Sequence, residues 1–340
     1  MRSRKRETTD VISALPFDDF RSLMRRLPPA DERAGDGVRA LLGRLDKPAG
    51  SLGRLEDIAA WLATWSGRVP PSVNRPLMAV FAGTHGVLAR GVSAHGPDWT
   101  ARRVELCAAG GAAISQLCLA SDIGLKVFDL ALHLPTADMT AEAALDERAC
   151  MATMAFGMEA ISGTDLLAIG DIGAGNSTVA AAIALAMNGG TADDWVSVRQ
   201  HEGAAMLSRR RHAVEDAVAL HRHHLGDPLE ALRRLGGREF AAIAGAIVAA
   251  RMEKVPVILD GLAAFAAAQV LHALEPEALR HCLLAQLPDT PGAAGIAARL
   301  GLTPLLDLAA SHGEGVSAAV AVGVVKCSAM AVAGMAATLR

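Results

Sequence analysis

The chain has 340 residues, which is enough for one large domain or two modest ones with a substantial core. Its formal net charge is −3, so no excess of basic residues points to a nucleic-acid partner. Aromatic residues make up 3% of the chain and tyrosine is absent, which argues against base-stacking platforms. The core is therefore expected to consist of Ala, Leu, Val, Ile and Met.

The apolar runs are rich in alanine and are broken by charge or glycine, so we expect no contact with a membrane. The five cysteines are widely scattered and form no Cys-x-x-Cys pair, which is typical of reduced thiols in a cytoplasmic protein. Residues 1–15 are charged and no apolar segment follows them, which predicts a disordered tail.

The N-terminal region has apolar residues at helical spacing, interrupted by a polar break at Asp46–Arg54. Residues 16–70 are therefore predicted to form the helical part of a small domain. A last helix, from about Gly315 to Thr338 within residues 311–340, is predicted to pack with it. Residues 71–310 are predicted to form an α/β nucleotide-binding domain.

Short apolar runs separated by helix-length segments predict the strands of this domain. The predicted strands are Leu77–Ala82, Leu125–Ala131, Leu166–Ile169, Val255–Leu259 and Cys282–Ala285. This alternation predicts an α/β fold, with a mostly parallel Rossmann-like sheet flanked by helices and a small helical domain beside it. Ligands of such sheets bind at the carboxyl ends of the strands.

A glycine-rich turn follows the third predicted strand, in residues 165–178. Gly173 and Gly175 allow close approach of a ligand to the backbone, and Asn176, Ser177 and Thr178 are expected to cap the following helix. Such a helix start suits a phosphate group. The glycine order matches neither the dinucleotide fingerprint nor a P-loop, so phosphate binding and a plain structural turn both stay open.

Glu314 lies between Gly313 and Gly315, just before the last helix. A carboxylate between glycines can approach a substrate and act as a general base, although acidic residues also favour helix starts for dipole reasons alone. His85 and Asp260 each follow a predicted strand, where they could shape a site or cap a helix.

Two polar clusters are expected to face solvent. His221, His223 and His224 have no carboxylate or cysteine nearby in sequence, so we expect no metal site there. The arginines at 209–211 are assigned by default to a solvated helix face.

Several segments together resemble one known family. Lys47–Glu56 is similar to a KPPGSLGRLE segment, Phe81–Val87 to FAADHGV, residues 170–178 to GEMGIGNTT, and the region from His312 to LGEGTGA. Gly110–Ile114 and Val257–Gly261 match further segments. These motifs, in this order, resemble the nicotinate-nucleotide–dimethylbenzimidazole phosphoribosyltransferase family.

The resemblance implies that phosphoribose passes from nicotinate mononucleotide to 5,6-dimethylbenzimidazole, giving α-ribazole 5′-phosphate and nicotinate for cobalamin biosynthesis. It implies a homodimer that acts on small molecules with no cofactor and no metal. It assigns the general base to Glu314 and phosphate binding to the glycine turn. The candidate substrate-binding residues are His85, Arg102, Asp171, Gly173, Gly175, Asn176, Ser177, Thr178, Arg210, Asp260, Gly313 and Gly315.

The chain departs from the family pattern at several loops. Asp171 replaces a Glu and Arg102 stands where a Gln is common. Residues 197–201 replace a GPGTG loop, so Arg199 and Arg210 become candidate cations for the phosphate. Residues 286–293 replace a segment like HVSGEPGH. A non-catalytic or substrate-shifted paralogue, serving as a binding or regulatory subunit, therefore stays open beside the enzyme.

Overall fold

A single parallel sheet organises the computed structural model, which describes residues 16–197 and 203–339. The predicted tail at 1–15 lies outside these residues. The strand order is β2-β1-β3-β4-β5, and every pairing is parallel. The strands are β1 (Pro76–Ala82), β2 (Gly124–Asp129), β3 (Leu166–Ile172), β4 (Val257–Leu259) and β5 (Cys282–Leu284). The α/β prediction and all five predicted strands are confirmed.

Strand β1 shows why the sheet is buried on both faces. Leu77, Ala79 and Phe81 point into the larger apolar cluster on one side of the sheet. Met78 and Val80, which alternate with them, belong to the cluster on the other side. This alternation follows from the two-residue period of a strand, and helices on both faces make both sets apolar.

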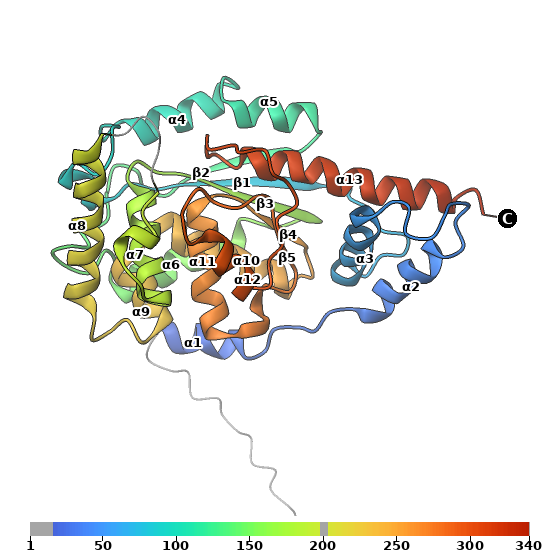
Figure 1. The fold of residues 1–340 in the computed structure, drawn as a ribbon, viewed down its shortest axis with the longest axis horizontal. Helices are drawn as coiled ribbons and strands as arrows, with labels where there is room; N and C mark the ends of the chain where they lie inside the picture. Colours follow the sequence, from blue (N-terminus) through green and yellow to red (C-terminus); the bar gives the residue numbers. More distant parts are fainter. Residues whose placement is uncertain (1–15, 198–202, 340) are drawn as a thin grey trace, which may run out of the picture.

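Helices cover each face of the sheet (Figure 1). The larger cluster receives α6 (Glu147–Glu159), α7 (Asn176–Asn188), α9 (Pro228–Leu235), α10 (Arg238–Met252) and α11 (Gly261–Leu274). The opposite face receives α4 (Trp99–Ala108), α5 (Ala113–Ala120) and α13 (Val316–Ala336). The remaining helices of this domain are α8 (Ala204–His221) and α12 (Ala293–Arg299), with short 3₁₀ turns at η1 (Gly86–Arg90), η2 (Ala192–Asp194) and η3 (Pro276–Leu279).

Helix α13 is long and apolar enough to cross a membrane by length and composition alone. Half of its most apolar window is buried, and it packs along the sheet before reaching α3 (Arg54–Ser66). Core helices of soluble proteins pass the same test, and packing on a sheet accounts for this one.

A small helical cluster lies beside the sheet and consists of α2 (Glu32–Leu42), α3 and the end of α13 (Figure 1). Val38, Ala63 and Val332 meet in its core. Helix α1 (Pro16–Met24) is different from what we expected, because Phe17 and Phe20 belong to the core of the large domain and α1 packs on α6. The helical cluster therefore begins at α2 and not at residue 16.

The polar segment between α2 and α3 forms a loop that side-chain contacts hold in place. Lys47 Nζ lies 2.7 Å from Glu56 Oε1, and the same oxygen accepts a hydrogen bond from the backbone N–H of Leu52 at 3.1 Å. Arg54 Nη1 donates to the carbonyl of Pro304 at 2.8 Å. The charged residues of this motif thus hold the loop and attach it to the large domain.

Candidate active site

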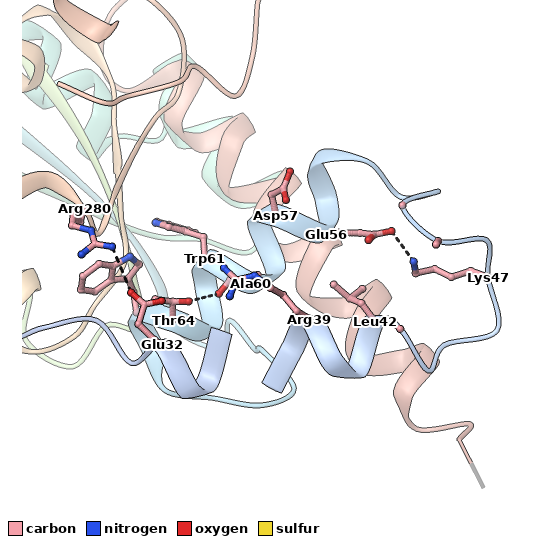
Figure 2. Close-up of a pocket in the computed structure, with 14 residues that line it drawn as sticks. Glu32, Arg39, Leu42, Lys47, Glu56, Asp57, Ala60, Trp61, Thr64 and Arg280 are labelled. Carbon is pink, nitrogen blue, oxygen red and sulfur yellow. Dashed lines mark hydrogen bonds and ion pairs between the residues drawn. The ribbon is translucent and has the colours of Figure 1, made fainter. Parts of the chain in front are cut away.

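Two cavities, each of about 510 Å³, compete as the functional site. One lies in the small helical cluster, where Figure 2 shows its side chains. Its charged groups largely satisfy each other, as in the Lys47–Glu56 pair and in Arg280, which lies 3.5 Å from Glu32. These ion pairs stabilise the helical cluster. The candidate catalytic and substrate-binding carboxylates Asp171, Asp260 and Glu314 line the other cavity.

The second cavity lies where the fold predicts a ligand site, over the carboxyl ends of β3, β4 and β5. Segments that are far apart in sequence meet there. Of the candidate residues, the cavity is lined by Asp171, Gly173, Gly175, Asn176, Ser177, Arg210, Asp260, Gly313 and Glu314. The glycine turn and the Gly-Glu-Gly segment thus face one space of small-molecule size.

The glycine turn begins three residues later than the sequence indicates, because β3 ends at Ile172 and not at Ile169. Strand β3 continues through Asp171 to Ile172 because its pairing with β1 continues that far. Helix α7 then starts at Asn176, with Gly175 as its N-cap at φ +87° and no side-chain cap. The expectation that Asn176, Ser177 and Thr178 cap the helix is wrong, since all three lie in its first turn.

These first-turn residues have other tasks. Asn176 Nδ2 donates a hydrogen bond to Asp171 Oδ2 at 2.5 Å, while Thr178 is fully buried and does not line the cavity. A side chain at Gly173 would place its Cβ 2.9 Å from Glu239 Oε1, because that buried carboxylate stands behind the turn. Because Gly175, Asn176 and Ser177 line the cavity, the N-terminus of α7, with its positive dipole end, lies at the cavity wall. An anion site requires such an arrangement.

Buried carboxyls shape the electrostatics around this helix start. Burial raises the pKa of Asp171 to about 7, with the neighbouring Glu239 and Asp260 acting in the same direction. Burial also raises the pKa of Asp260 to about 6. Asp171 is thus partly protonated at neutral pH, which reduces its repulsion of an anion at the turn.

Arg210 lines the cavity, which agrees with its selection as a candidate cation for the phosphate. The default assignment of this arginine cluster to a solvated helix face is wrong for Arg210. Its side chain is buried, with Nε donating to the carbonyl of Val92 at 2.7 Å and Nη1 to that of Ser197 at 3.4 Å. Arg209, in contrast, is exposed and donates to the carbonyl of Gly91 at 2.7 Å. Arg199 lies outside the described residues.

Glu314 is buried and lines the cavity, with a left-handed backbone at φ +61°. Its N–H donates to the carbonyl of Asp171 at 3.3 Å, which ties the loop to the end of β3. Gly170 makes this closeness possible, since a Cβ there would lie 2.6 Å from the Cα of Gly315. Gly315 itself does not line the cavity but packs on β3.

The guanidinium that meets Glu314 comes from Arg103. Its Nε donates to Glu314 Oε1 at 2.7 Å, and its Nη2 donates to the same oxygen. Arg102 is exposed and does not line the cavity. The spacing along α4 explains the difference, because Arg103 shares the inward face of Thr100 and Cys107, both buried.

His85 and Asp260 have structural partners. His85 is buried beneath the turn, with Nε2 2.6 Å from Glu239 Oε1, and it does not line the cavity. Asp260 does line the cavity, and its Oδ2 accepts a hydrogen bond from the N–H of Ala318 at 3.0 Å. Asp260 therefore caps the start of α13, which follows Glu314.

Sequence reasoning missed Arg103, His312 and an aromatic pair. The rings of His95 and Trp99 stack at 4.3 Å between centroids, with 13° between their planes, and both line the cavity. Helical periodicity from Trp99 to Cys107 could have identified Arg103. No local pattern marks a stacked pair before its loop is folded.

No group of three potential metal ligands occurs among residues 16–197 and 203–339. His223 and His224 are exposed as expected, but His221 is buried and its Nε2 lies 3.0 Å from the carbonyl of Met139. His221 therefore has a structural role.

Comparison with known proteins shows which family the chain belongs to. A family model described as phosphoribosyltransferase matches residues 27–339. A nicotinate-nucleotide–dimethylbenzimidazole phosphoribosyltransferase of Brucella melitensis is 59% identical over 325 residues, covering 95% of this chain and 96% of the relative. A Brucella canis protein of the same name matches equally well, at 59% identity. The chain belongs to this phosphoribosyltransferase family.

Solved structures of the family share the fold. A crystal structure of the enzyme from Thermus thermophilus superposes with a TM-score of 0.82 at 33% identity, covering 91% of this chain and 99% of that one. The departures from the family motifs therefore sit on a shared framework. One of them, Gln286, holds a neighbouring loop, since its Nε2 donates to the carbonyl of Ala310 at 2.5 Å and its Oε1 accepts from the N–H of that residue.

Proposed function

We propose that this chain transfers the phosphoribosyl group of nicotinate mononucleotide to 5,6-dimethylbenzimidazole, releasing nicotinate and α-ribazole 5′-phosphate for cobalamin biosynthesis. The observation that carries the proposal is one cavity lined both by the buried Glu314 and by the glycine turn at the start of α7. The 59% identity to enzymes of that name supports the same reaction.

The cavity suggests how the nucleotide is held. Its phosphate binds at the N-terminus of α7, beside Gly175, Ser177 and the guanidinium of Arg210. A planar base lies toward the stacked rings of His95 and Trp99, which offer an aromatic face. The two substrates are thus held in one orientation, which lowers the entropic cost of their reaction.

The chemistry is a displacement at C1′ of the ribose. One nitrogen of dimethylbenzimidazole attacks C1′ with its lone pair, and the bond to nicotinate breaks with its electrons staying on the pyridine nitrogen. The other benzimidazole nitrogen loses its proton to Glu314 as positive charge develops. We propose no cofactor, because positioning and one carboxylate supply every step.

A chromatographic assay with nicotinate mononucleotide and 5,6-dimethylbenzimidazole tests the function. We expect α-ribotide and free nicotinate from the purified protein, and turnover at least ~10²-fold lower in Glu314→Gln with the thermal midpoint little changed. Glu253→Gln, which changes an exposed carboxylate at the C-terminal end of α10, is the matched control. Absence of product, with a working relative assayed alongside, would favour the non-catalytic or substrate-shifted paralogue.

We further propose that the enzyme is a cytoplasmic homodimer. Helices α4, α5 and α13 lie together on one face (Figure 1) and expose Leu106, Leu119 and Met330, the last two at 77% and 71%. Apolar side chains gathered on one face are typical of a subunit interface. Light scattering after size exclusion measures the mass, and a monomer at micromolar concentration would contradict the dimer.

A further inference from the structure

The two carboxylate oxygens of Glu314 have different surroundings. Oε1 receives Nε and Nη2 of Arg103, whereas Oε2 is buried and has no hydrogen-bond partner among the described residues. A buried oxygen without a donor is destabilising in the folded state, which makes it a candidate for a role in the reaction. Oε2 is therefore the oxygen that is free to accept a proton from a substrate in the cavity.

The imidazole of His312 lies close to this oxygen. Its Nε2 is 3.4 Å from Glu314 Oε2 and 3.3 Å from Arg103 Nη2. A guanidinium can only donate, so Nε2 accepts from Arg103 and the ring proton of the neutral imidazole is on Nδ1. Two acceptors, Oε2 and Nε2, thus face each other with no hydrogen atom between them.

His312 also connects this buried oxygen with solvent. The Glu314 side chain is 3% exposed, while that of His312 is 50% exposed. A proton that arrives on Oε2 can form an O–H···N hydrogen bond to Nε2, and the far side of the ring is open to water. The pair is arranged as a path from the cavity to the surface.

We propose that His312 relays the substrate proton from Glu314 to solvent, an inference that rests on the proposed function. Benzimidazole gives its N–H proton to Glu314 Oε2, whose electron pair forms the new O–H bond. That proton then moves to Nε2 of His312, which restores the carboxylate and forms an imidazolium. The imidazolium releases its Nδ1 proton to water, and a shift of the remaining ring proton back to Nδ1 through solvent readies both residues for another turnover.

The other ionisable groups near Glu314 differ from His312 in their contacts and charge. Cys107 lies nearby on α4, but burial and the charge of Glu314 raise the pKa of its thiol to about 11, so it stays neutral. Asp171 accepts from Asn176, and Asp260 accepts from the backbone of α13. Arg103 has no lone pair for a proton.

His312 departs from the family motif. The motif that Glu314 matches, LGEGTGA, has leucine where this chain has His312. A leucine side chain cannot accept a proton. Leucine is therefore the most informative substitution for His312, because it removes the imidazole and leaves the residue that the family motif has at this position.

The test measures turnover of His312→Leu and His312→Ala in weak buffer. We expect kcat to fall about tenfold while both KM values stay the same, a smaller effect than the ~10²–10⁴ of a direct general base because water replaces the ring slowly. Added imidazole should restore kcat of His312→Ala, since the exposed site leaves room for it. The wild type should not respond.

His223→Ala is the matched control, because His223 is also exposed and its Nε2 also accepts from an arginine, Arg222 Nε, at 2.9 Å. Nitrogen-15 NMR of the histidine rings adds a readout that needs no turnover, with the His312 proton expected on Nδ1. Unchanged kcat in His312→Leu, or a ring proton on Nε2, would overturn the relay. Lack of product with wild type would instead overturn the proposed function.

Discussion

Replacing Gly170 with alanine should reduce turnover without touching any ligand. The added Cβ would lie 2.6 Å from the Cα of Gly315, while ordinary contact begins at 3.4 Å, so the loop that carries Glu314 must move by about 0.8 Å. The obstacle is backbone, which cannot rotate aside as a side chain can. A misplacement of ~1 Å can lower a rate by ~10², so we expect kcat to fall by about that factor.

The same crowding should cost about 1–3 kcal/mol of folding free energy, the usual range for overpacking. Steady-state kinetics and thermal unfolding of the same preparation separate the two effects. Gly323→Ala is the control, because a Cβ there meets only Ser121 Oγ at 3.9 Å and alanine favours the helix. Full kcat in Gly170→Ala would refute the idea that β3 fixes the position of Glu314.

Two further predictions concern the anion side of the cavity. Arg210→Lys should raise the KM for nicotinate mononucleotide about 10- to 100-fold, as loss of a charged hydrogen bond of ~1.5–3 kcal/mol implies, and an unchanged KM would contradict phosphate binding by Arg210. The raised pKa of Asp171, about 7 against an ordinary 3.8, contributes stability below pH ~3.8 that is lost as the pH rises through 7. Asp171→Asn should therefore gain stability relative to wild type as the pH rises from about 4 to 7 in thermal unfolding, and a difference independent of pH would speak against the burial argument.

The sheet could be predicted from the sequence because each of its strands is a buried apolar run with a helix after it. Its ends were less certain, since Gly170 and Asp171 look like a turn but continue the pairing with β1. Helix α1 was misplaced for a related reason. Its phenylalanines show that it packs on something, but not that the partner is α6.

The site residues that could be predicted from the sequence are those that follow the carboxyl ends of the strands or precede the last helix. Glu314, Asp260 and the glycine turn do meet in one cavity. Arg102 was chosen over Arg103 because the motif comparison points to one position, whereas the inward face of α4 depends on the buried Thr100. The default assignment of residues 209–211 to solvent is wrong for Arg210 because its partners are backbone carbonyls, which leave no trace in sequence, whereas its selection as a candidate phosphate cation agrees with its place in the cavity lining.

Helix α13 begins two residues after Glu314 and ends among the side chains of α3, so it works as a lever between the base and the small helical cluster. Its 21 residues span ~31 Å at ~1.5 Å per residue. A tilt of only about 2° at the far end moves the near end by ~1 Å, which is the scale at which catalytic geometry is lost. Replacing Val332, which is buried in the helical cluster, with a larger residue should thus change kcat through Glu314, which lies near the other end of this helix.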